Sequence, residues 1–255
     1  MTIEKSLQKA DVIVLEADGK IDPQHGYGHL IVKRLAEFNI NAIIISIVEN
    51  TQTLEKLPPK PLILSGGMTE VTADVDWLNK TREFITGKIK ANQKLEKEKR
   101  TPIFGICFGA QLLAECYSKG SVKYLDDPEI GITKVTIGSP PHLIFNGYKE
   151  DFNAYTFHYN QIKTQDVSTI SSHQHKNHHF IQAFEIPNAS CYGIQFHPEF
   201  NYKEFITLLH TYKQLLKDLG LNAENIIKSL PKIQKNSIIF KNFIDLTKKE
   251  AKMEK

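Results

Sequence analysis

Short apolar runs alternate with amphipathic segments through the first part of the chain. Four runs have the length and the apolar, partly β-branched composition of buried strands, and three segments between them have the character of helices. The strand candidates are residues 11–17, 41–48, 61–67 and 101–106, and the helix candidates are residues 29–39, 75–95 and 108–120. This alternation predicts an α/β fold with a mainly parallel central sheet and helices on both faces.

The pattern changes after about residue 121, where strand candidates become short and are separated by Gly, Pro, Asn and Asp. These candidates are VKYL, GITKVTI, NAYTFHY, VSTISSH, HFIQAFEI and SCYGIQF. They predict β-hairpins that are added to the same domain. Residues 204–220 then have the spacing of one amphipathic helix that ends at Gly220.

The residues after Gly220 contain one apolar patch, at 238–244, before a Lys- and Glu-rich end. The patch predicts a helix that packs on the preceding domain, because an amphipathic helix needs an apolar surface to cover. We therefore expect one domain over residues 1–220 and a C-terminal helical extension over residues 221–255, frayed at its end.

Composition narrows the possible partners. The 255 residues are 41% hydrophobic and 24% charged, with a formal net charge of only +3. The Lys-rich runs lack the interleaved aromatic residues of a nucleic-acid-binding surface. No segment reaches the roughly 18 continuous apolar residues of a membrane span, and early charges interrupt any signal-peptide core. We expect a cytoplasmic protein that binds neither nucleic acid nor a membrane.

No motif indicates a metal ion or a cofactor. The segment 18–28 contains glycines but no G-x-G-x-x-G, so a nucleotide cofactor is not expected. A polar hairpin tip accounts for a group of four histidines without a ligand; they are His173, His175, His178 and His179. The three cysteines, Cys107, Cys116 and Cys191, are too few and too far apart for a disulfide framework or a CxxC zinc site. One of them can instead be a catalytic thiol.

Cys107 has the setting of a nucleophile. In GICFGA it lies between a strand candidate and a helix candidate, with Gly105 and Gly109 at positions −2 and +2. A sharp strand-to-helix turn needs small neighbours, and it places the sulfur at the positive end of the helix, which favours the thiolate. The amide of Phe108 would then face the oxygen that becomes negative during attack.

A candidate general base and its orienting carboxylate follow another strand candidate. In QFHPEF, His197 and Glu199 are two residues apart, so in an extended segment they face the same side. A carboxylate beside one imidazole nitrogen fixes the tautomer and supports the imidazolium form. With Cys107 as nucleophile, activity should fall at acid pH as the Cys–His pair becomes fully protonated.

Three separated motifs, LSGG, GICFGAQ and HPEF, occur in the order and spacing of a known family. Together they resemble class I glutamine amidotransferase domains with a Cys-His-Glu triad, and in particular stand-alone proteins related to the amidotransferase domain of GMP synthase. The resemblance covers roughly residues 11–215. It implies the flavodoxin-like fold of that family and no cofactor.

The resemblance also implies roles for individual residues. Cys107 would attack the glutamine side-chain amide, His197 would transfer protons, and Glu199 would orient His197. Gly67 and Phe108 would form the oxyanion hole. Further substrate contacts would come from Gly66, Gln111, His158, Tyr159 and Asn160. The segment Glu129–Gly131 resembles a recurring family segment and is expected to be structural.

Two other functions share these motifs. The same triad could hydrolyse a γ-glutamyl peptide, because the chemistry at sulfur is identical, or the chain could be a non-catalytic regulatory subunit that keeps the fold. Neither end of these 255 residues has room for an acceptor-activating domain. If the chain is an amidotransferase, the ammonia would therefore pass to a separate synthetase subunit, or the protein would act alone as a hydrolase.

Overall fold

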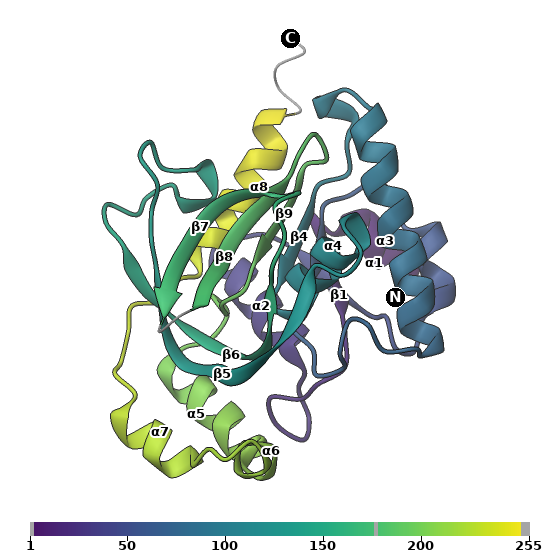
Figure 1. Ribbon diagram of the computed structural model, residues 1–255. Helices are drawn as coiled ribbons and strands as arrows, with labels where there is room; N and C mark the ends of the chain where they lie inside the picture. Colours follow the sequence, from purple (N-terminus) through teal and green to yellow (C-terminus); the bar gives the residue numbers. More distant parts are fainter. Residues whose placement is uncertain (1–2, 176–177, 251–255) are drawn as a thin grey trace.

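A seven-stranded sheet forms the centre of the molecule (Figure 1). The structure is a computed structural model that describes residues 3–175 and 178–250. In spatial order the strands are β2 (Ala42–Ser46), β1 (Val12–Glu16), β3 (Leu62–Leu64), β4 (Ile103–Ile106), β9 (Cys191–Ile194), β8 (His178–Ile186) and β7 (Ser168–His175). The first five are parallel, and β8 and β7 continue the sheet antiparallel. The predicted mainly parallel α/β sheet is confirmed.

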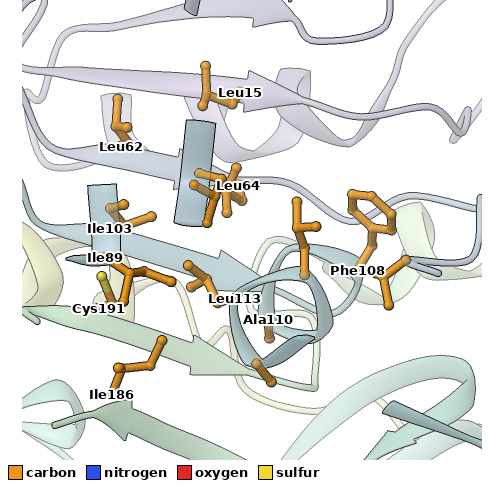
Figure 2. Close-up of a cluster of buried hydrophobic side chains, with 14 of the residues drawn as sticks. Leu15, Leu62, Leu64, Ile89, Ile103, Phe108, Ala110, Leu113, Ile186 and Cys191 are labelled. Carbon is orange, nitrogen blue, oxygen red and sulfur yellow. The ribbon is translucent and has the colours of Figure 1, made fainter. Parts of the chain in front are cut away.

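Helices cover both faces of this sheet, as predicted. The helices of the described residues are α1 (Ile3–Lys9), α2 (Tyr27–Ala36), α3 (Asp76–Lys94), α4 (Phe108–Tyr117), α5 (Tyr202–Thr211), α6 (Lys213–Asp218), α7 (Ala223–Ser229) and α8 (Ile238–Glu250), with short 3-10 helices η1 (Thr51–Lys56), η2 (Lys97–Lys99) and η3 (Leu143–Phe145). Helices α3 and α4 bury apolar side chains on one face, and α2 and α8 do so on the other. Figure 2 shows Ala110 and Leu113 of α4 among Leu64 and Ile103 of the strands.

The carboxyl ends of the parallel strands lie at one edge of the sheet. Residues Ile13 to Leu15 of β1 and all of β4 are buried, as expected for strands covered on both faces. Strands β3, β4 and β9 are direct neighbours. The chain therefore leaves the same edge three times, just before Gly66, at Cys107 and before His197, which is where α/β sheets place their sites.

A second sheet consists of two antiparallel strands, β5 (Val122–Val135) and β6 (Phe152–Ile162). The sequence predicts two short strands, VKYL and GITKVTI, where the structure has the single 14-residue strand β5. The residues between these runs remain in the strand through a register shift between Tyr124 and Glu129. A bulge of this kind absorbs extra residues without ending the strand.

The prediction of one helix over residues 204–220 is wrong in one respect. The segment forms two helices, α5 and α6, that meet at Tyr212 with backbone angles φ −101° and ψ 23°. The Tyr212 hydroxyl accepts a hydrogen bond of 2.8 Å from the Lys20 amide, and the Thr211 hydroxyl donates to the Ile21 carbonyl at 2.6 Å. These hydrogen bonds join the helix junction to a loop about 190 residues earlier in the chain. Helical periodicity does not reveal such a long-range contact.

The apolar patch predicted near the C-terminus forms α8 and packs on the sheet. Phe243 stacks on Phe104 of β4 with ring centroids 5.2 Å apart, and Phe240 meets the same ring edge-on at 6.4 Å. All three side chains are fully buried. Within the part of the chain that the structure describes, no helix has the length and apolar composition needed to cross a membrane.

Candidate active site

Cys107 lies on a sharp turn between β4 and α4. Its backbone angles, φ 49° and ψ −104°, are unusual for a residue with a side chain. Such a conformation costs roughly 1–3 kcal/mol and persists only where the surrounding structure enforces it. Here the Cys107 amide donates to the Ile194 carbonyl at 2.8 Å, and the Gln111 amide donates to the Cys107 carbonyl at 2.9 Å. The neighbouring strand and the first turn of the helix therefore hold the strained residue.

The two glycines that flank the turn are required by close packing. A Cβ atom on Gly105 would lie 2.4 Å from the carbonyl oxygen of Gly109, and one on Gly109 would lie 2.4 Å from that of Leu64. No side chain fits at such distances. The predicted need for small residues two positions before and after the cysteine is confirmed.

The sulfur of Cys107 is almost enclosed, with 5% of the residue exposed. It lies at the N-terminus of α4, the positive end of the helix dipole. Sγ is 3.7 Å from the carbonyl oxygen of Phe157 in β6, to which the protonated thiol, but not the thiolate, can donate a weak hydrogen bond. The thiol is thus directed at β6.

His197 and Glu199 form a buried pair after β9. Nδ1 of His197 lies 2.7 Å from Oε1 of Glu199, and the two side chains are 1% and 0% exposed. Because a carboxylate only accepts, Nδ1 carries a proton and Nε2 faces away from the pair. The His197 amide donates to the Tyr155 carbonyl at 2.9 Å. The guanidinium of Arg34, itself buried, donates from Nε to the Glu199 carbonyl at 2.9 Å.

The charges of the site favour the imidazolium form of His197. Burial opposes protonation, but the negative charges of Glu199 and of Cys107 outweigh it and raise the pKa of His197 to about 10. Because Nδ1 faces Glu199, the ring nitrogen on the side of Cys107 is Nε2, and the contact with Cys107 helps to raise this pKa. The ring of Tyr27 stacks on the imidazole with centroids 5.5 Å apart.

The loop after β3 brings Gly66 and Gly67 to the same place. A Cβ on Gly66 would be 3.1 Å from Cε1 of His197, and one on Gly67 would be 3.1 Å from the ring of Phe108. In the part of the chain that the structure describes, neither the Gly67 nor the Phe108 amide donates a hydrogen bond. Two unused donors near one thiol are what an oxyanion hole requires.

Asp18, which the sequence motifs do not identify, holds this loop. Its Oδ1 accepts hydrogen bonds of 3.1 Å from the amides of Met68 and Thr69, and its Oδ2 accepts one of 2.7 Å from the Thr69 hydroxyl. Asp18 follows β1, so it lies at the same edge of the sheet as the predicted site. A polar residue directly after a parallel strand was the signal that could have identified it.

Of the predicted substrate contacts, Gln111, His158, Tyr159 and Asn160 line a small cavity beside Cys107, and Gly66 does not. The wall of this cavity consists of Gly67, Met68, Thr69, Cys107, Gln111, Phe157, His158, Tyr159 and Asn160, and its volume is about 20 Å³. Gln111 Nε2 donates to the Asn160 carbonyl at 3.2 Å. The Tyr159 hydroxyl donates to the Met68 carbonyl at 2.8 Å. Asn160 thus takes part through its backbone, and Tyr159 through contact with the loop after β3.

His158 has its polar contacts in a second buried cluster. Its Nε2 lies 2.7 Å from Oε2 of Glu129, and its Nδ1 lies 2.8 Å from the Asn160 carbonyl. Glu129 is also 3.2 Å from Nε2 of His173 and accepts a 3.0 Å hydrogen bond from Gln182. Burial opposes ionisation of Glu129, but hydrogen bonds from the two histidines outweigh it and hold the pKa of Glu129 well below its usual value.

This cluster changes the interpretation of the histidine-rich hairpin. His173 does not belong to a solvated tip, because its side chain is 13% exposed and paired with Glu129. The side chains of His175 and His178 lie outside the described residues. Among the residues that the structure describes, no group of three His, Cys, Asp or Glu side chains could hold a metal ion.

Two larger surface hollows lie elsewhere. One of about 630 Å³ lies between residues 147–153 and 232–238, and one of about 820 Å³ lies between η1 and α3. Neither contains a nucleophile next to a base. The small cavity at Cys107, in contrast, is lined by the candidate nucleophile.

Comparison with known proteins agrees with this arrangement. The family model described as "Glutamine amidotransferase class-I" matches residues 20–211. One subunit of the glutamine-hydrolyzing GMP synthase of Methanococcus maripaludis is 29% identical over 212 residues, which cover 78% of this chain and 94% of that polypeptide. The glutamine-hydrolyzing GMP synthase of Helicobacter acinonychis is 30% identical over 175 residues, which cover 68% of this chain but only 30% of the longer enzyme.

Solved structures show the same fold. The crystal structure of a glutamine amidotransferase from Thermotoga maritima superposes with a TM-score of 0.68, covering 95% of this chain and 99% of that one. The two sequences are 17% identical. The likeness therefore concerns the fold alone.

Proposed function

The chain belongs to the class I glutamine amidotransferase family, and on this premise we propose that it hydrolyses the side-chain amide of glutamine and releases ammonia for a separate synthetase. The observation that carries the proposal is the strained Cys107 at the start of α4 beside a His197–Glu199 pair held at 2.7 Å.

The first half of the reaction forms a thioester. The Cys107 thiolate attacks the amide carbon of glutamine, and the amides of Gly67 and Phe108 stabilise the oxygen that becomes negative. His197 gives the proton on Nε2 to the amide nitrogen as the carbon–nitrogen bond breaks. Ammonia leaves, and the γ-glutamyl group remains bound to sulfur.

The second half releases glutamate. His197, now neutral at Nε2, takes a proton from water as the water attacks the thioester carbonyl. The carbon–sulfur bond breaks, Cys107 returns to the thiolate and His197 is again an imidazolium. Glu199 keeps Nδ1 protonated throughout, so Nε2 is the atom that exchanges protons.

The acceptor of the ammonia is proposed from the relatives. The matched residues cover 94% of the Methanococcus polypeptide, itself one subunit of a GMP synthase, but 30% of the Helicobacter enzyme. We propose that the partner is a synthetase subunit of the GMP synthase type. Mixing the chain with such a subunit should make amination depend on glutamine, whereas added ammonium should support the synthetase by itself.

The decisive variant is Cys107→Ala, assayed with and without the synthetase subunit for glutamate release. Activity should fall by about 10³-fold or more, because loss of the nucleophile leaves only binding and the oxyanion hole. Cys116→Ala is the matched control, since burial raises the pKa of that thiol to about 12 and keeps it unreactive. Equal glutamate release by Cys107→Ala and wild type would eliminate the mechanism.

A further inference from the structure

The cavity beside Cys107 is too small for the substrate. Its volume of about 20 Å³ is enough for one water molecule. Glutamine is a whole amino acid and needs several times this space. The described arrangement is therefore closed to glutamine, although it is not sealed from solvent, and some part of the wall has to move before the amide reaches the sulfur.

Two segments face each other across this cavity. One is the loop Gly66–Thr69 after β3, and the other is Phe157–Asn160 of β6. The Tyr159 hydroxyl joins them by donating a 2.8 Å hydrogen bond to the Met68 carbonyl. The half-buried Tyr159 ring also meets the ring of Tyr124 at 6.1 Å, and Tyr124 is 57% exposed, so this contact lies toward solvent.

Each of the two segments is anchored separately. Asp18 holds the loop through the Met68 and Thr69 amides. Glu129 holds β6 through His158, the residue immediately before Tyr159. Because both segments have their own supports, the contact between the Tyr159 hydroxyl and Met68 can break without unfolding either one.

The closed arrangement also affects the nucleophile. Sγ of Cys107 lies 3.7 Å from the Phe157 carbonyl oxygen. Phe157 belongs to the same β6 segment as Tyr159. Movement of this segment away from the loop would both enlarge the cavity and release the thiol.

We propose that Tyr159 is a latch whose hydrogen bond to the Met68 carbonyl holds the site closed and must break before glutamine reaches Cys107. The proposal rests on the proposed function, because it concerns access of glutamine to the same thiol. It assigns Tyr159 to control of access, where the family resemblance implies a substrate contact. Burial raises the pKa of Tyr159 to about 12, so the hydroxyl keeps its proton and remains a donor at neutral pH.

The test measures how fast Cys107 is alkylated in the full chain. Two reagents are used, iodoacetamide and a chloroketone analogue of glutamine, and peptide mass analysis identifies the labelled cysteine. Tyr159→Phe removes the latch hydroxyl and keeps the ring. It should accelerate labelling by both reagents by the same factor, about 2- to 10-fold, which is the effect of losing one ordinary hydrogen bond. Tyr159→Ala should accelerate both further.

Tyr117→Phe, a hydroxyl deletion at the far end of α4, is the control and should leave both rates at the wild-type value. If iodoacetamide labels Tyr159→Phe no faster than wild type, the latch is refuted. Slower labelling by the glutamine analogue alone would also refute it and would make Tyr159 a substrate contact. If the analogue labels no form of the chain, the proposed function fails, while the iodoacetamide rates still decide the latch.

Discussion

At the scale of single residues, one carboxylate sets the charge of the site. Glu199 is completely buried and has one partner for Oε1, the imidazole of His197. Its Oε2 has no hydrogen-bond partner among the described residues. An incompletely satisfied buried carboxylate is costly, so its negative charge acts strongly on the neighbouring ring. Proton transfer by His197 should therefore depend on the charge of Glu199, and not only on the hydrogen bond by which Glu199 orients the ring.

Glu199→Gln should lower kcat for glutamine hydrolysis by about 10²- to 10⁴-fold, the usual contribution of general acid–base catalysis. The variant keeps the size of the side chain but removes the charge that helps raise the pKa of His197 to about 10. That pKa should fall. The imidazolium, which in wild type is lost as pH rises through about 10, should then be lost at lower pH.

The measurement is the pH profile of kcat. The alkaline limb of this profile should move to lower pH in Glu199→Gln, because proton transfer to the leaving nitrogen needs the imidazolium form. Glu83→Gln, an exposed position on α3, is the matched control and should leave the profile in place. An unchanged alkaline limb in Glu199→Gln would show that the carboxylate acts on orientation alone.

At the scale of elements, Glu129 connects four strands. It lies on β5 and reaches His158 of β6, His173 of β7 and Gln182 of β8. It therefore ties the two-stranded sheet to the antiparallel edge of the main sheet. Because His158 precedes the proposed latch residue, this cluster also fixes the base of the segment that covers Cys107.

Glu129→Gln should lower the free energy of unfolding at pH 7 by about 2–3 kcal/mol, the size of a lost charge-assisted hydrogen bond. The pKa of Glu129 is depressed in the folded state, so its stabilisation is present above the usual value of 4.5 and is lost as pH falls below it. Below pH 4.5 the unfolding free energy of wild type should therefore fall more steeply than that of the variant, by about 1.4 kcal/mol per pH unit.

Denaturant unfolding at pH values from 7 to 3 measures both effects. Asp126→Asn on the exposed side of β5 is the control, and its acid limb should run parallel to that of wild type. Parallel limbs for Glu129→Gln would contradict the depressed pKa. A neutral-pH stability equal to wild type would contradict the role of Glu129 in joining the sheets.

The sequence predicts features that depend on residues close together in the chain, and it does not predict features that depend on contacts between residues far apart in the chain. The turn at Cys107 was predictable, because a strand, two glycines and a helix are adjacent in the chain. The Glu129 cluster was not, because Glu129 pairs with His173 two strands further along the chain. The break at Tyr212 depends likewise on a bond to Lys20. Hydrophobic periodicity depends only on residues that are close in the chain. Contacts between residues far apart in the chain do not change this pattern.

At the scale of the whole molecule, the core and the proposed site share one strand. β4 carries Phe104 under α8 and ends directly at Cys107. The motifs of the site predicted which residues meet at the edge of the sheet, because parallel strands bring their carboxyl ends together. The closed cavity was not predictable, since it depends on how β6 lies against the loop after β3.

Because β4 belongs both to the core and to the proposed site, a core substitution can test whether stability and Cys107 reactivity are independent. Phe243→Ala removes a fully buried ring stacked on Phe104, so the free energy of unfolding should fall by about 3–5 kcal/mol. The backbone bonds that hold Cys107 are untouched, so the alkylation rate per folded molecule should stay at the wild-type value. Lys241→Ala, exposed on the same helix, should change neither quantity. If Phe243→Ala unfolds like wild type, α8 is not part of the core. A changed alkylation rate at full folding would mean that α8 sets the geometry of the nucleophile through β4.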